Sequence, residues 1–145
     1  MTEPTKSAGL EGIVAGVTCL STVGKEGAGL TYRGYSIEDL AEHATFEEVA
    51  WLLLYGELPK PSELDEFLAR LQSQRGLPAQ LKAVLAQLPE SAHPMDVLRT
   101  ACSALGCLEP EDSAADQQRV TERLLAIFPS ALAYWHHFEI GRAHV

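Results

Sequence analysis

Apolar residues recur with helical spacing along most of the chain after residue 45. Four segments place them at intervals of three and four residues, the pattern of a helix with one face in a protein core. The residues on these faces are Phe46, Val49, Ala50, Leu53 and Leu54; Leu64, Phe67, Leu68 and Leu71; Leu81, Val84, Leu85 and Leu88; and Met95, Leu98, Cys102 and Leu105. Trp51, Leu52 and Tyr55 make the first of these helices apolar nearly all round, so we expect it to be central. The pattern predicts a mostly α chain of about six helices.

Residues that favour helix ends bound these segments. Ser36 and Thr45 are predicted N-caps, and Thr45 begins a T-x-x-E capping box. Ser62 is the predicted cap of the next helix. That helix should end at Gly76 and the following one begin at Pro78, so we expect the two to form an antiparallel pair across a tight turn.

The pattern differs between residues 12 and 35, where glycines alternate with β-branched and aromatic residues. This pattern of residues predicts a short β-hairpin, with residues 17–22 paired with residues 30–33 around a Gly-Lys-Glu-Gly turn. A phosphate-binding loop is the alternative. It is disfavoured because Lys25 does not follow a G-x-x-x-x-G run and no helix is predicted after Gly29.

Two further segments, residues 93–106 and about 115–138, are joined by an acidic turn and are too apolar for lone surface helices. We expect another apolar surface, including a second copy of the chain, to cover them. Ala101 and Ala104 are small enough to let another helix approach closely. Pro129 lies inside the second segment and should kink it near Ile127.

Composition narrows the class of protein. With 145 residues, of which 46% are hydrophobic and 21% charged, the chain has the profile of one soluble domain behind a frayed tail of residues 1–8. The net charge of -9 argues against a nucleic-acid partner. Apolar runs fall short of the ~20 residues that span a bilayer, and the N-terminus is not that of a signal peptide. Cys19, Cys102 and Cys107 form no C-x-x-C pair, which favours a reduced, cytoplasmic chain.

Chemically active side chains are present but form no recognisable site. The five histidines include no pair at i, i+4 spacing, so a metal site is unsupported. His93 precedes a proline, and we expect it to cap a helix rather than to perform acid–base chemistry. No G-x-S-x-G motif supports a serine nucleophile. Cys102, on a core stripe, and Cys107, just past the end of its helix, are interpreted as small hydrophobic residues.

Four arginines could bind an anionic ligand: Arg33, Arg70, Arg75 and Arg99. Arg33 is the most interesting because it lies where the predicted hairpin ends. The alternative, which we favour, ties it to a nearby carboxylate or helix carbonyl. No catalytic, cofactor-binding or metal-binding set can be assembled from these residues.

Several longer segments resemble the citrate synthase family. They are TVGKEG (22–27), LTYRGYSIEDL (30–40), FEEVA (46–50), LYGELP (54–59), RGLP (75–78), HPMDVLRT (93–100) and FPSALAYW (128–135). The resemblance covers about residues 9–138 and is greatest to the 2-methylcitrate synthase branch. It implies the first part of a large, almost entirely helical domain with a short β-hairpin, in a homodimer whose interface includes the helices of residues 93–138.

The resemblance also implies an activity for the complete enzyme. Members are acyltransferases that condense an acyl-CoA with oxaloacetate, giving 2-methylcitrate from propionyl-CoA, which we favour, or citrate from acetyl-CoA. These reactions belong to propionate catabolism through the methylcitrate cycle and to the tricarboxylic acid cycle. CoA enters as the thioester substrate, and no cofactor is covalently bound. The family's catalytic histidines and aspartate lie beyond the position matching Phe138, so we assign no catalytic residue here and expect this chain alone to be inactive.

The last seven residues, EIGRAHV (139–145), break the helical pattern and do not resemble the family. They look like an in-frame translation of a sequencing adapter, and we treat them as a non-family tail of that origin. The expected organisation is thus a tail (1–8), a partial large domain (9–138) and this segment. A second hypothesis remains open, in which the chain is a short non-enzymatic helical module that dimerises through residues 93–138.

Overall fold

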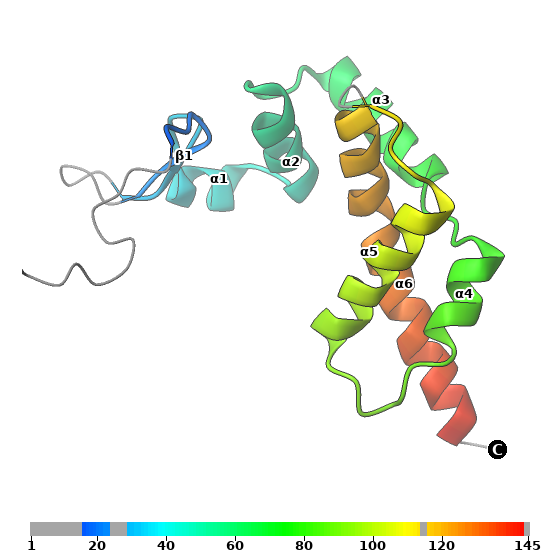
Figure 1. Cartoon of the computed structure of the whole chain (residues 1–145). Coiled ribbons are helices and arrows are strands. Elements are labelled where there is room, and N and C mark those ends of the chain that lie inside the picture. Colours follow the sequence, from blue (N-terminus) through cyan, green and yellow to red (C-terminus); the bar gives the residue numbers. More distant parts are fainter. Residues whose placement is uncertain (1–15, 24–28, 114–115, 144–145) are drawn as a thin grey trace, which may run out of the picture. The chain divides into compact units, whose positions relative to one another are not determined.

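The computed structural model of the chain (Figure 1) describes residues 16–23, 29–113 and 116–143. It divides into two compact units, an N-terminal unit (Met1–Pro59) and a C-terminal unit (Lys60–Val145). The predicted mostly α fold with a small β element is confirmed, since the described residues form six helices and one three-stranded antiparallel sheet. The predicted tail of residues 1–8 and the glycine turn of residues 24–27 lie outside the described residues.

The small sheet of the N-terminal unit contains the predicted hairpin and one strand more. Strand β2 (Thr31–Tyr32) lies between β1 (Ser21–Thr22) and β3 (Tyr35–Ser36). The turn from β2 to β3 consists of Arg33 and Gly34, with φ angles of 50° and 91°. Two central residues with positive φ match the right-handed twist of a hairpin. Sequence reasoning missed β3 because an arginine, unlike asparagine or glycine, rarely adopts this conformation.

Two capped helices complete the N-terminal unit. Helix α1 (Ile37–His43) begins after Ser36, whose Oγ accepts the N–H of Asp39 at 3.2 Å. Helix α2 (Phe46–Tyr55) begins with the predicted capping box, in which Thr45 Oγ1 accepts the N–H of Glu48 and the Glu48 carboxylate accepts the N–H of Thr45. Both predicted N-caps are confirmed.

The predicted core face of α2 is only partly correct. Ala50 and Leu52 are buried and most of its other apolar residues are half-buried, but Phe46 is 67% exposed. Phe46 is the first residue of α2 and lies about one turn before the buried Ala50.

The C-terminal unit is built from α3 (Pro61–Ser73), α4 (Ala79–Leu85), α5 (Pro94–Leu108) and α6 (Gln117–Ala143). Helices α5 and α6 lie side by side, α4 packs on both, and α3 packs on α6 (Figure 1). The expected antiparallel pairing of α3 with α4 is therefore wrong. Leu81 and Leu85 of α4 are buried in the cluster that it forms with α5 and α6, whereas Val84 of the predicted face is 38% exposed.

Capping residues were predicted for two of these four helices, α3 and α5. Ser62 does not cap α3: the helix begins at Pro61, and the Glu63 carboxylate accepts the N–H of Lys60 at 2.7 Å. A proline suits the first helical position, because the N–H that it lacks would have no partner there. His93 caps α5 as expected, since its Nδ1 accepts the N–H of Met95 at 3.2 Å.

The core of the C-terminal unit joins three helices. Its buried members are Leu81, Leu85, Val97, Ala101, Leu105, Ile127, Ala131 and Trp135. The predicted core stripe of α5 is wrong, because only its Leu105 is buried, whereas Met95 is 64% exposed and Cys102 is exposed. Cys107 is likewise exposed and lies within α5 rather than past its end. The packed face of α5 carries Val97, Ala101 and Leu105 instead.

Helix α6 is longer than expected. It includes Pro129 and runs to Ala143, so the predicted end of the helical pattern after Phe138 is wrong. Most residues between 139 and 143 are adequate helix formers and can extend an existing helix at little cost. The adapter origin of residues 139–145 stays a hypothesis. Among the described residues, no helix is both long enough and apolar enough to cross a membrane.

Candidate functional site

Arg33, the arginine that the sequence singles out, lies between the sheet and α2. Its Nη2 donates to the carbonyl oxygen of Leu53 at 3.1 Å, and its Nη1 donates to Cys19 Sγ at 2.9 Å. Leu53 is in the last turn of α2, where carbonyl groups have no helical partner. The interpretation of Arg33 as a residue tied to a helix carbonyl is confirmed. The guanidinium joins the β2–β3 turn to the end of α2, although its buried Nε has no hydrogen-bond partner among the described residues.

The other candidate arginines divide between buried and exposed contacts. Arg70 of α3 donates from Nε and Nη2 to the two carboxylate oxygens of Glu122 on α6, at 3.1 and 3.2 Å, and Glu122 is 6% exposed. Arg99 pairs with Asp96 one turn away on the surface of α5. Arg75 is exposed between α3 and α4. Arg33 lies in the N-terminal unit, and Arg70, Arg75 and Arg99 lie in different segments of the C-terminal unit.

A fifth arginine, Arg123, contacts one carboxylate and two backbone carbonyl groups. It lies on α6, and its Nη2 and Nε bind the Glu109 carboxylate at 2.8 and 3.0 Å. Its Nη1 donates to the carbonyl oxygens of Gln74 and Gly76, in the loop between α3 and α4. The hydrogen bonds from Arg123 hold the pKa of Glu109 below its usual range, so the carboxylate is ionised near neutral pH. Arg123 thus joins two loops to α6.

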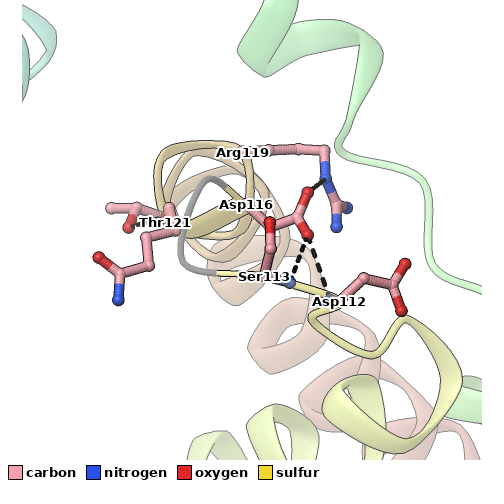
Figure 2. Close-up of polar contacts among 6 residues, drawn as sticks. Asp112, Ser113, Asp116, Arg119 and Thr121 are labelled. Atoms are coloured by element: carbon pink, nitrogen blue, oxygen red, sulfur yellow. Dashed lines mark hydrogen bonds and ion pairs between the residues drawn. The ribbon is translucent and has the colours of Figure 1, made fainter.

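The acidic turn before α6 is ordered by Asp116 (Figure 2). One carboxylate oxygen of Asp116 accepts the N–H groups of Asp112 and Ser113 at 3.2 and 3.1 Å, and the other accepts Arg119 Nε at 3.4 Å. The hydrogen bond from Asp112 is the largest of the effects that lower the pKa of Asp116. These hydrogen bonds tie Asp112 and Ser113 to Asp116, the residue before α6.

Histidines and cysteines do not converge. Within the described residues, no three histidine, cysteine, aspartate or glutamate side chains are placed to hold a metal ion. His93 caps α5, His43 lies 3.9 Å from Glu42 on the surface of α1, and His136 and His137 are neighbours on α6. The histidine of the family-like motif at residues 93–100 is therefore a structural residue here.

The remaining candidate features are apolar surfaces of α5 and α6. Met95, Leu98 and Cys102 follow one another along α5 and form what we call the outer face of α5; Met95 and Cys102 are exposed and Leu98 is half-buried. A cavity of about 110 Å³ lies between α5 and α6, and its wall includes the apolar Leu105, Val120 and Leu124 and the charged Glu109, Glu111, Arg119 and Arg123. An open groove of about 460 Å³ is lined by Pro94, Pro129, Leu132, Ala133, Trp135 and His136. The groove and the outer face of α5 are apolar and are suited to packing rather than to bond-making chemistry.

The comparisons with known proteins agree in one family. The model of the family described as "Citrate synthase, C-terminal domain" matches residues 9–145, a range that extends beyond residue 138. The chain is 58% identical to the 2-methylcitrate synthase of Shewanella oneidensis over 131 residues, which are 90% of this chain and 35% of that protein. It is 46% identical to 2-methylcitrate synthase 2 of Corynebacterium glutamicum over 128 residues, 86% of this chain and 33% of that protein.

Solved structures give the same answer for the fold. Citrate synthase from Thermotoga maritima superposes with a TM-score of 0.78 at 34% identity, over 92% of this chain and 35% of that one. Citrate synthase from Thermoplasma acidophilum, solved as a ternary complex with carboxymethyl coenzyme A and oxaloacetate, superposes with a TM-score of 0.78 at 25% identity, over 89% and 35%. The chain thus spans about a third of the length of these relatives. Its sequence and its fold together establish that it belongs to the citrate synthase family.

Proposed function

We propose that this chain is part of an acyltransferase that condenses an acyl-CoA with oxaloacetate and releases CoA. The observation that carries the proposal is the 58% identity to a 2-methylcitrate synthase over 90% of the chain. Propionyl-CoA is the favoured substrate and 2-methylcitrate the favoured product, because the relatives at 58% and 46% identity both have that name. Acetyl-CoA and citrate are the alternative. The reaction is a Claisen-type condensation at the thioester, followed by thioester hydrolysis.

Within that enzyme, we assign these 145 residues a structural role and no catalytic one. General acids and bases work best when their pKa lies near the operating pH. Hydrogen bonds, from the backbone or from Arg123, lower the pKa of four carboxyl groups; they are Glu38, Glu48, Glu109 and Asp116. Carboxylates stabilised as anions are weak proton acceptors at neutral pH. We therefore expect the chain alone to be inactive and the catalytic groups to come from the rest of the enzyme.

The complete enzyme is proposed to be a cytoplasmic homodimer, with α5 and α6 in the subunit interface. The outer face of α5 supports this proposal, because Met95 and Cys102 expose a stripe that a dimer would cover. Obligate dimer interfaces are more hydrophobic than ordinary protein surface. Neither a nucleic acid nor a membrane is proposed as a partner, and the net charge of -9 disfavours binding to phosphate groups.

The decisive experiment measures CoA release by two proteins. One is the complete reading frame recovered from the source DNA by a long read across the codon for Phe138, and the other is the present chain. Each is mixed with oxaloacetate and either propionyl-CoA or acetyl-CoA, and free thiol is followed over time. We expect release by the complete protein only, with a larger kcat/KM for propionyl-CoA. No release by the complete protein with either thioester would refute the enzymatic proposal, and release by the 145-residue chain would refute its inactivity.

The second candidate is a non-enzymatic helical module that dimerises through residues 93–138. The observation in its favour is that the C-terminal unit has a core of its own, in which three helices bury eight residues. A module of this kind should melt sharply and sediment as a dimer, since its fold would be complete. An incomplete part of a larger enzyme should instead bind a hydrophobic dye and aggregate. Sedimentation and dye binding of the purified chain distinguish the two.

A further inference from the structure

We draw no further inference here: the strongest candidate, the apolar groove that Pro94, Pro129, Leu132 and Trp135 line between the start of α5 and the middle of α6, carries none because nothing in the structure shows what covers it.

Discussion

Arg123 on α6 and Glu109 at the end of α5 form a two-point ion pair, with nitrogen–oxygen distances of 2.8 and 3.0 Å. The arginine side chain is 13% exposed and the glutamate side chain 31%, so water screens the pair only in part. Two carbonyl groups of the α3–α4 loop take further hydrogen bonds from the same guanidinium. This one side chain holds together three segments that are far apart in the sequence.

We predict that Arg123→Met destabilises the chain by about 2 kcal/mol, because it leaves the Glu109 carboxylate and two carbonyl groups without their donor. Arg99→Met is the matched control, since Arg99 pairs with Asp96 on the surface with exposed fractions of 77% and 54%. Exposed pairs of this kind contribute about 0.5 kcal/mol or less. Urea unfolding followed by circular dichroism measures both, and equal losses in the two variants would contradict the role given to Arg123.

The same pair predicts a pH dependence. The hydrogen bonds from Arg123 lower the folded-state pKa of Glu109 below its usual value of 4.5, so its contribution to stability is present above that value and is lost as the pH falls through the folded-state pKa. We expect Glu109→Gln to lower the free energy of unfolding at about pH 6, and its difference from the wild type to shrink steadily below about pH 4.5. A difference that stays constant down to about pH 3 would show that the carboxylate charge is not what stabilises the fold.

Two glycines should respond to alanine in opposite directions. Gly106 lies inside α5 with no atom within 4 Å of the position a Cβ would take, so Gly106→Ala should stabilise the chain by about 0.5–1 kcal/mol. Gly56 ends α2 with a φ of 96°, where an L side chain is strained, so Gly56→Ala should cost about 1 kcal/mol. Thermal unfolding of the two variants measures whether each substitution raises or lowers the stability of the fold. Destabilisation by Gly106→Ala would mean that this side of α5 is not open.

The proposed dimer predicts an effect at the outer face of α5. Met95→Glu in the complete enzyme should raise the dimer dissociation constant at least tenfold, because it buries an unpaired charge. The fold should tolerate it, since Met95 is 64% exposed and an acidic residue suits the first turn of a helix. Leu68→Glu, at an apolar position of α3 that is 37% exposed, is the control. Sedimentation of both variants measures their dimer dissociation constants. An unchanged constant for Met95→Glu would exclude the outer face of α5 from the dimer interface.

Local motifs were predictable because their partners are close in sequence. In the capping box the partners Thr45 and Glu48 are three residues apart, and His93 caps an N–H two residues away. Both partners of each hydrogen bond therefore lie in one short stretch of sequence. The α5 face was predicted wrongly for a physical reason. Its stripes through Met95 and through Val97 are both apolar, and periodicity alone does not decide which of two such stripes is buried.

Long-range contacts had no sequence signal. Arg123 finds its carbonyl partners 49 and 47 residues earlier, in a loop whose position depends on where α3 and α4 pack. The wrong prediction that α3 and α4 form an antiparallel pair also arose because the deciding contacts are distant in the sequence. A tight turn between two helices suggests that they pack on each other, but Leu81 and Leu85 are buried in a cluster with residues of α5 and α6. Topology of this kind is decided by total apolar area, which no local pattern reports.

Glu122 and Arg123 are consecutive on α6, yet they bind different neighbours, Arg70 on α3 and Glu109 after α5. Consecutive helical residues point about 100° apart. Which neighbours these two charged residues can reach therefore depends on how α6 is rotated about its own axis. A helix displaced by one residue would turn Glu122 toward Glu109, or Arg123 toward Arg70. Either slip would replace an attraction with a repulsion of like charges. The order of Glu122 and Arg123 in the sequence thus selects one rotation of α6 about its axis, the one in which both ion pairs form.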